Sequence, residues 1–307
     1  MRTELNALVA NVGKVIRGKD DAIRMAVTCL LARGHLLIED VPGVGKTSLA
    51  SALASSLNCS FQRIQLTSDL LPSDLLGTMI FDPATQQFHL KAGPIFHHIV
   101  VADEINRTTP RTQSALLEAM NEGQVTLDSR THALPRPFMV LATQNPADFA
   151  GTFPLPESQL DRFLMRISLG YPDREAEREV IVGTVLPQEL APVMGADQVV
   201  AMQHETEQVR VDETLVAYIL DIISTTRKSP AVALGASPRA AKALYRAAQA
   251  FASLEGYDYV VPRHIKELAV PVLAHRILLK EAGTVRGNSM RAEEVLRALL
   301  EEVAVPL

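Results

Sequence analysis

The stretch Ile38-Glu39-Asp40-Val41-Pro42-Gly43-Val44-Gly45-Lys46-Thr47 runs from an apolar segment into a glycine-rich turn that ends Gly-Lys-Thr. Gly43 and Gly45 let the backbone turn so that successive N–H groups converge on an anion, at a helix N-terminus whose dipole favours negative charge. In this pattern Lys46 reaches the β- and γ-phosphates of ATP, and the Thr47 hydroxyl holds Mg²⁺. The stretch therefore predicts a phosphate-binding loop (P-loop). Its expected nucleotide contacts are Pro42, Gly43, Val44, Gly45, Lys46, Thr47 and Ser48.

The residues around this loop fit the prediction with one departure. Residues His35–Glu39 have the pattern of a buried parallel strand, and Thr47–Leu57 that of a helix. The strict P-loop pattern has its first glycine where this chain has Asp40. The alternative, a glycine-rich turn that only links a strand to a helix, stays open from this motif alone.

A second apolar run, His98–Glu104, ends in two carboxylates. This is how a Walker B strand delivers acids to the carboxyl edge of a sheet, and phosphoryl transfer needs both the phosphate loop and a metal-holding acid. We expect Asp103 to position Mg²⁺ through water and Glu104 to polarise the attacking water. A strand that ends in a solvated Asp-Glu turn is the alternative.

Composition limits the classes of protein. The chain has 307 residues, 47% of them hydrophobic, and a formal net charge of −5, so it can form one full-sized and one small globular domain. No apolar run approaches the roughly 20 residues that span a bilayer. The N-terminus lacks the pattern of an export signal, so we expect a cytoplasmic protein. The basic residues are scattered, which argues against a nucleic-acid partner.

The first 170 residues alternate strands and helices, as in a mostly parallel α/β sheet. Two polar insertions interrupt the pattern, at about residues 77–94 and 123–135, and each reads as a hairpin. These hairpins are either plain surface loops or functional elements. The predicted strands are His35–Glu39, Phe61–Leu66, His98–Ala102, Phe138–Thr143 and Phe163–Leu169.

From residue 171 to residue 307 the pattern is helical, which predicts a small all-helical second domain. Asp212 can cap one helix, and Ser237 followed by Pro238 starts another that Gly256 ends. The predicted helices are Arg174–Val185, Glu213–Arg227, Pro238–Leu254, Arg263–Ala274 and Met290–Val303.

Further motifs follow in order along the chain: Val15–Asp20 near the N-terminus, Thr143–Pro146 directly after a predicted strand, Glu157–Phe163 before the last strand, and Ala236–Ala240 at a helix start. Together with the P-loop and the strand that ends in two acids, these motifs follow an order that resembles that of the AAA+ ATPase family. Asp40–Thr47, Ala102–Arg107 and Leu116–Met120 resemble more narrowly its MoxR branch. The resemblance covers nearly the whole chain. It implies a P-loop NTPase core followed by a helical lid.

The resemblance also implies roles for single residues. Asn145 corresponds to sensor 1, Arg162 to the arginine finger that reaches a neighbouring subunit's ATP, and Arg239 to the sensor 2 that touches phosphate from its own subunit's lid. The adenine seat would be formed by Val15, Ile16 and Gly18. From the residues alone, Arg162 can equally pair with Asp161 or Glu157, and Arg239 can be a solvated charge.

As function, the resemblance implies a hexameric ATPase that remodels or matures partner proteins, such as von Willebrand factor A domain proteins, including metal-cofactor insertion. The two insertions would face the pore of the ring, where Phe81 and Phe88 either meet substrate or only pair with each other. Two other functions stay open: a nucleic-acid motor of the helicase type, and a slow nucleotide-gated scaffold.

Overall fold

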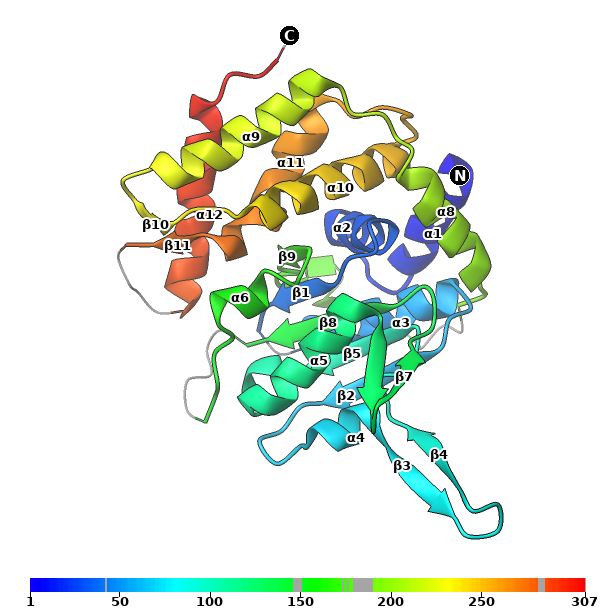
Figure 1. Ribbon diagram of the computed structural model, residues 1–307. Helices are drawn as coiled ribbons and strands as arrows, with labels where there is room; N and C mark the ends of the chain where they lie inside the picture. Colours follow the sequence, from blue (N-terminus) through cyan, green and yellow to red (C-terminus); the bar gives the residue numbers. More distant parts are fainter. Residues whose placement is uncertain are drawn as a thin grey trace.

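The computed structural model describes residues 1–41, 43–145, 151–172, 174–175, 177–178, 190–280 and 285–306, and the side chains of all of these except 285–288. The core is a five-stranded parallel sheet in the order β2-β5-β8-β1-β9 (Figure 1). The predicted α/β fold class is confirmed. The strands of this sheet are β1 (Leu36–Glu39), β2 (Phe61–Gln65), β5 (Ile99–Asp103), β8 (Met139–Gln144) and β9 (Met165–Ile167).

Helices cover both faces of the sheet, which explains why its central strands are buried and mostly apolar. All residues of β5 and β8 are buried. Alternate strand residues join two different hydrophobic clusters: Val101 packs with the first, and Val100 and Ala102 with the second. The helices that supply these clusters from residues 1–122 are α1 (Arg2–Gly13), α2 (Asp20–Leu31), α3 (Lys46–Ser56), α4 (Pro72–Leu76) and α5 (Pro110–Glu122), with the 3-10 turn η1 at Ile105–Arg107.

Both expected hairpins are present, and they project on the side of the sheet away from the C-terminal helices (Figure 1). The first pairs β3 (Gly77–Asp82) with β4 (Gln87–Ala92), and the second pairs β6 (Gln124–Leu127) with β7 (Arg130–Ala133). Phe81 and Phe88 are paired across the first hairpin with ring centroids 5.2 Å apart, yet they remain 47% and 56% exposed. The aromatic pair therefore forms, and it also presents a large apolar surface to solvent.

The C-terminal part is helical, as predicted, and its helix starts follow the predicted caps. Asp212 accepts a hydrogen bond from the Thr214 N–H at 2.9 Å, and Ser237 accepts one from the Ala240 N–H at 3.1 Å. The predicted helix Arg174–Val185 lies largely outside the described residues. The elements from residue 157 onward, β9 apart, are α6 (Glu157–Leu160), α8 (Ala196–Thr206), α9 (Glu213–Lys228), α10 (Pro238–Glu255), α11 (Pro262–Leu273), η2 (Ala274–Arg276) and α12 (Val285–Glu302).

One feature of this lid differs from the expectation that it is all helical. Val232–Leu234 (β10) and Leu278–Leu279 (β11) form a short antiparallel pair between helices. The pair has three residues on one strand and two on the other, which is too short for a periodicity signal to reveal in the sequence. None of the helices described is long and apolar enough to cross a membrane.

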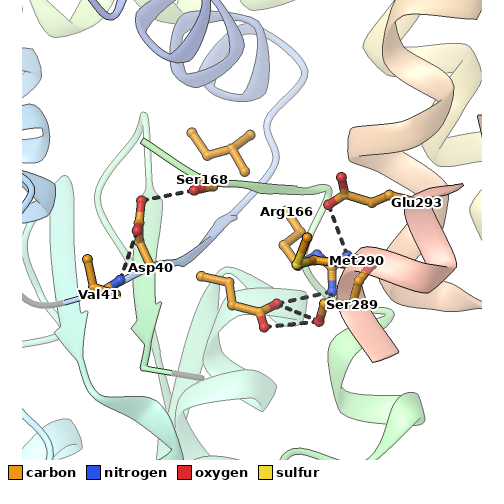
Figure 2. Close-up of a pocket in the computed structure, with 9 residues that line it drawn as sticks. Asp40, Val41, Arg166, Ser168, Ser289, Met290 and Glu293 are labelled. Carbon is orange, nitrogen blue, oxygen red and sulfur yellow. Dashed lines mark hydrogen bonds and ion pairs between the residues drawn. The ribbon is translucent and has the colours of Figure 1, made fainter. Parts of the chain in front are cut away.

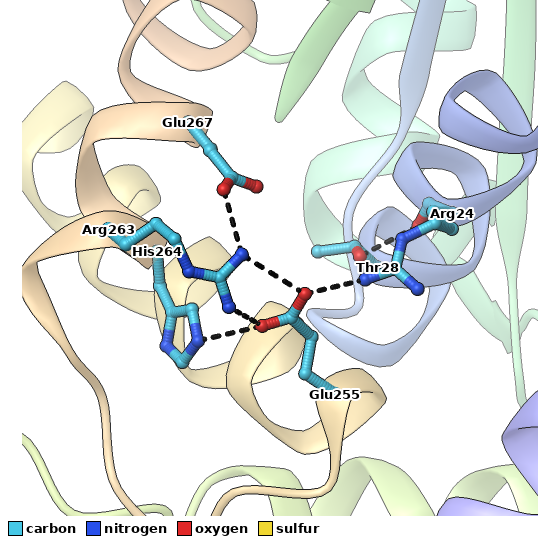
Figure 3. A network of polar contacts seen from close by, with 6 residues as sticks. All are labelled: Arg24, Thr28, Glu255, Arg263, His264 and Glu267. Carbon is cyan, nitrogen blue, oxygen red and sulfur yellow. Dashed lines mark hydrogen bonds and ion pairs between the residues drawn. The ribbon is translucent and has the colours of Figure 1, made fainter.

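The lid and the sheet share one hydrophobic cluster, which runs from β1 through α2 to α10 and α11. Polar contacts reinforce this packing, and Glu255 at the end of α10 is their centre (Figure 3). Its carboxylate accepts hydrogen bonds from Arg24 of α2 at 2.8 Å, from His264 of α11 at 3.0 Å, and from Arg263. Burial alone would raise the pKa of Glu255, but the hydrogen bonds from Arg263 and His264 outweigh burial and lower it. The N-terminal helix α2 is thus tied to two lid helices at once.

His35 holds the start of β1 to two other elements. Its Nδ1 accepts a hydrogen bond from the Val140 N–H of β8, and its Nε2 donates to the Met120 carbonyl of α5, both at 3.0 Å. Burial lowers the pKa of His35 to about 4, and the hydrogen bond to Met120 opposes this effect only in part. The imidazole is therefore neutral in the folded chain.

This depressed pKa predicts an acid-sensitive fold. Between pH 6.5 and 4, His35 is protonated in the unfolded chain but not in the folded chain. The free energy of unfolding therefore falls as the pH falls. We expect His35 to account for about 2 kcal/mol of lost stability between pH 7.5 and 5. Urea unfolding at the two pH values measures this. His35→Asn should be less stable at pH 7.5 but show a correspondingly smaller loss at pH 5; an unchanged loss would contradict the prediction.

Candidate nucleotide-binding site

The predicted P-loop connects the carboxyl end of β1 to the N-terminus of α3. Gly43 and Gly45 have φ angles of +86° and +94°, a left-handed conformation that strains any residue with a Cβ. Gly45 immediately precedes α3, whose first residue is Lys46. The unpaired N–H groups of this helix start and the turn before it form an anion-binding surface. Pro42 lies outside the described residues.

Lys46 lies within this loop. Its Nζ donates to the carbonyl oxygens of Asp40 at 2.7 Å and Val41 at 3.2 Å. Burial lowers the pKa of Lys46, while the nearby carboxylates of Asp40, Asp103 and Glu104 act in the opposite direction. The positive charge of Lys46 is therefore close enough to be attracted by Asp103 and Glu104, the two acids of the second motif.

Those carboxylates lie at the carboxyl end of β5, which β8 separates from the P-loop strand β1 in the sheet. Asp103 is buried, and its Oδ1 accepts a hydrogen bond from the Thr143 hydroxyl of β8 at 3.0 Å. The same hydroxyl accepts the Glu104 N–H at 2.9 Å. Glu104 has φ 58° and ψ 54°, a left-handed conformation that is uncommon for a residue with a side chain. Thr143 thus orients two acids that leave the strand in different directions.

Strand β2 contributes two side chains that the sequence reasoning missed. Arg63 Nε donates to Asp103 Oδ2 at 2.6 Å, and Gln65 Nε2 donates to Glu104 Oε2 at 3.2 Å. Glu104 also pairs with Arg107 at 3.1 Å. The available signal was the spacing of Arg63 and Gln65: two residues apart at the carboxyl end of a predicted strand, they share one face of the sheet.

These side chains enclose a cavity of about 320 Å³. It brings together the predicted phosphate, metal and water contacts, including Thr47 and Asn145. Hydroxyl and carboxylate oxygens are the donors that Mg²⁺ prefers, so Thr47 and Asp103 suit that ion, and the turn N–H groups with Lys46 suit a polyphosphate. The residues lining the cavity are Gly43, Gly45, Lys46, Thr47, Ser48, Arg63, Gln65, Asp103, Glu104, Thr143 and Asn145.

Asp40, the departure from the glycine pattern, has a structural role. It is buried, and its Oδ2 accepts hydrogen bonds from the Ser168 hydroxyl at 3.0 Å, the Leu169 N–H at 2.8 Å and the Gly170 N–H at 2.6 Å. Its Oδ1 accepts the Val41 N–H at 2.8 Å. The carboxylate therefore fastens the start of the P-loop to the segment that leaves β9.

The lid contacts the core beside this point (Figure 2). Arg166 of β9 donates to Glu39 of β1 at 3.1 Å and to the Ser289 hydroxyl of α12 at 2.7 Å. The Ser289 hydroxyl donates to Glu39 at 3.0 Å, and Glu293 lies 3.4 Å from the Arg166 guanidinium. Arg166 and Glu39 are nearly enclosed, with side chains 8% and 11% exposed. The lid is thus joined to the strand that carries the P-loop.

The predicted adenine seat lies in part against the P-loop. Ile16 is buried, with its Cδ1 3.8 Å from the position that a Cβ on Gly45 would occupy. Val15 packs on the main hydrophobic cluster, and Gly18 has a left-handed φ of +67°. Lys19 donates to the Tyr171 carbonyl at 2.6 Å, which ties this segment to the chain after β9. Adenine contact by Val15, Ile16 and Gly18 stays a prediction.

Neither Arg162 nor Arg239 is among the described residues that line the P-loop cavity. Arg162 lies in the turn between α6 and β9, and the predicted alternative of a pairing with Asp161 or Glu157 does not occur in the described structure. Asp161 pairs instead with Arg276 at 2.8 Å, and Arg239 lies 3.9 Å from it. Arg239 belongs to the first turn of α10, and contact of its side chain with the phosphate of its own subunit stays a prediction.

Sheet geometry explains the separation. β1 and β9 are parallel with Leu36 opposite Met165, so Arg162 lies at the amino edge of the sheet while the P-loop leaves the carboxyl edge. At about 3.3 Å per strand residue, the two edges are on the order of 10 Å or more apart. Arg162, Asp161 and Arg239 therefore form a separate cluster, the arginine cluster, on a different side of the molecule.

Comparison with known proteins agrees with this architecture. The model of the ATPase family associated with various cellular activities (AAA) matches residues 35–165, and the AAA lid domain model matches residues 224–298. The Bacillus subtilis protein YeaC is 46% identical over 99% of this chain and 95% of its own length. Chaperone MoxR1 of Mycobacterium tuberculosis is 37% identical over 98% of this chain and 82% of its own.

A solved structure is similar over the full length. The crystal structure of a protein from Cytophaga hutchinsonii superimposes with a TM-score of 0.90 at 38% identity, covering 100% of this chain and 96% of the other. The two chains are therefore similar in sequence as well as in fold.

Proposed function

We propose, from the premise that this chain belongs to the MoxR family of AAA ATPases, that it binds ATP with Mg²⁺ in the P-loop cavity and hydrolyses ATP to ADP and phosphate. One observation carries the proposal. Lys46 and Thr47 of the P-loop face Asp103 and Glu104 across a single cavity, which also contains Asn145. This is the set of groups that phosphoryl transfer to water requires: a phosphate cradle, a metal-holding acid and a group that orients water.

Each side chain has a distinct task in this mechanism. The N–H groups before α3 and the Lys46 ammonium hold the β- and γ-phosphates. Thr47 and Asp103 would hold Mg²⁺, which when bound would withdraw charge from the phosphate oxygens. Glu104 orients the attacking water and accepts its proton, and Asn145 fixes that water from β8. Thr143 helps to orient both acids, because its hydroxyl donates a hydrogen bond to the Asp103 carboxylate and accepts one from the Glu104 N–H.

The proposed reaction needs a second subunit, since the arginine cluster lies at the other edge of the sheet from the P-loop. We place Arg162 as a finger at a neighbour's ATP in a ring, for which six subunits is the proposed number. Arg239 reaches the same neighbouring site from beside Asp161. Its side chain is 55% exposed and lies 3.9 Å from Asp161. Contact with the phosphate of its own subunit, as the family resemblance implies, remains the alternative.

The purpose proposed for hydrolysis is to remodel partner proteins, with von Willebrand factor A domain proteins and metal-cofactor insertion as the specific candidates. Two facts support the general proposal that the substrate is another protein. A relative that matches 98% of this chain is named a chaperone. The hairpin β3-β4 presents Phe81 and Phe88 to solvent on the side of the molecule away from the lid (Figure 1), where an extended partner could pack against them.

ATP binding tests the site. Lys46→Ala should lower ATP affinity on the order of 100-fold, because a hydrogen bond to a charged group contributes about 1.5–3 kcal/mol and Lys46 meets two phosphates. Isothermal titration measures the affinity, and the ATP-induced rise in melting temperature provides an independent reading. Lys242→Ala, which removes an exposed lysine of α10, is the matched control. Equal affinity in Lys46→Ala and wild type would overturn the assignment.

A further inference from the structure

Arg276, at the end of η2 in the lid, is a buried charge that pairs with Asp161 of the arginine cluster. Its side chain is 3% exposed. All three of its guanidinium nitrogens donate hydrogen bonds within the described structure. Nε contacts Asp161 Oδ1 at 2.8 Å, Nη1 contacts the Leu164 carbonyl at 3.1 Å and that of Val272, and Nη2 contacts the Asp161 carbonyl at 3.2 Å.

These contacts surround Arg162 on both sides along the chain. Nη2 of Arg276 also donates to the Phe163 carbonyl at 2.6 Å, so residues 161, 163 and 164 are all held. His275 adds a second donor, with its Nε2 3.1 Å from the same Phe163 carbonyl. The backbone of the finger segment (residues 161–164) is therefore held by two consecutive lid residues, and none of the described hydrogen bonds or ion pairs joins these two residues to the Arg162 side chain.

The hydrogen bonds from Arg276 fix the position of the finger segment closely. A guanidinium is a planar fork whose donors have fixed relative directions, and a buried charge is costly once its partners are lost. Burial lowers the pKa of Arg276 to about 10, although the Asp161 carboxylate opposes this, so the group stays charged at neutral pH. Charge-assisted hydrogen bonds therefore join the lid to the finger segment at neutral pH.

We propose that Arg276 is the positioning residue of the arginine finger: by holding the backbone on both sides of Arg162, it sets the direction in which that guanidinium reaches a neighbour's ATP. The inference rests on the proposed function, since it requires a finger that acts between subunits. Its consequence is that the lid of one subunit controls hydrolysis in the next one.

The first test is Arg276→Lys, which keeps the charge but lacks the forked donors. We expect unchanged ATP affinity and hydrolysis lowered on the order of 10- to 100-fold, as for a misplaced catalytic group. Arg24→Lys is the matched control, because Arg24 is also an arginine that joins core and lid, through Glu255 on another side of the lid. An equal loss in Arg24→Lys would show a general effect of weakened docking and overturn the proposal.

The second test separates positioning of the finger from damage to the subunit's own ATP site. Subunits with Lys46→Ala have no working nucleotide site but present an intact finger. Mixed with Arg276→Lys subunits in rings shown to contain both, they should restore hydrolysis at the intact ATP sites of the Arg276→Lys subunits. No recovery, in conditions where Arg162→Ala does recover, would overturn the positioning role alone. If Arg162→Ala also fails to recover, the assignment of Arg162 as a finger that acts between subunits is wrong.

A milder variant covers the case in which Arg276→Lys does not fold. Asp161→Asn removes only the charge from one partner and leaves the backbone carbonyls in place, and the Asp161 side chain is 20% exposed. We expect the same recovery by Lys46→Ala with a smaller initial loss. A loss in Asp161→Asn that the mixed ring does not repair would also count against Arg276 as the positioning residue.

Discussion

Replacing Arg162 with alanine should leave ATP binding intact and lower ATP hydrolysis by a factor on the order of 10³ to 10⁵, as removal of an arginine finger does in GTPase systems. The reason is geometric. Arg162 precedes β9 at the amino edge of the sheet, whereas the P-loop leaves β1 at the carboxyl edge. Its positive charge can therefore stabilise the transition state only at a site supplied by another copy of the chain.

Three measurements check this expectation. Titration of Arg162→Ala with ATP should reproduce the wild-type affinity. The specific activity of the wild type should rise with protein concentration as rings assemble. Mixing Arg162→Ala with Lys46→Ala should restore part of the activity, because some interfaces then pair an intact ATP site with an intact finger.

Full activity from dilute monomer would contradict a finger that acts between subunits. So would a complete lack of recovery in rings shown to be mixed. Arg178→Ala is a suitable control, since Arg178 is 70% exposed and its described ion pair is with Glu175, three residues earlier.

Replacing Glu104 with glutamine should have the second large effect: ATP stays bound and turnover stalls. Glutamine keeps the size of the side chain but cannot accept a proton from water, and removal of a general base costs on the order of 10²- to 10⁴-fold in rate. Phosphate release under ATP saturation measures the loss. Glu122→Gln, at the exposed end of α5, is the matched control.

The stalled variant also tests protein remodelling. If hydrolysis releases the partner, Glu104→Gln should retain partner proteins in the presence of ATP and lose them without it. Retention that does not depend on ATP would count against coupling of the cavity to partner binding. Hydrolysis by Glu104→Gln at the wild-type rate would remove this residue from the mechanism.

Much of the candidate nucleotide site could be predicted from the sequence, because its parts are local. A left-handed turn at Gly43 and Gly45, a helix start at Lys46 and an acid at the end of β5 each depend on a few neighbouring residues. The helix limits set by Asp212, Ser237 and Gly256 are local in the same sense, since each is a cap formed within about four residues.

Other parts of the site depend on how distant segments pack, and sequence reasoning missed them. Arg63 and Gln65 reach the Walker B acids only because β2 pairs with β5, in a register that sets Gln65 opposite Asp103. Thr143 meets the same acids through the pairing of β8 with β5. No spacing in the sequence reports which strands become neighbours.

The sequence by itself determined the glycine-rich loop, the acids at the carboxyl end of β5, the parallel core and the helical lid, because backbone conformation and burial periodicity are properties of short segments. Only the tertiary structure decided where the lid docks, and with it that Arg276 holds the finger segment and that Arg239 lies beside Asp161. Those contacts join residues as much as 115 positions apart. They form because a shared hydrophobic cluster brings the lid onto the sheet, and a buried guanidinium then takes whichever carbonyl and carboxylate groups that docking brings within reach.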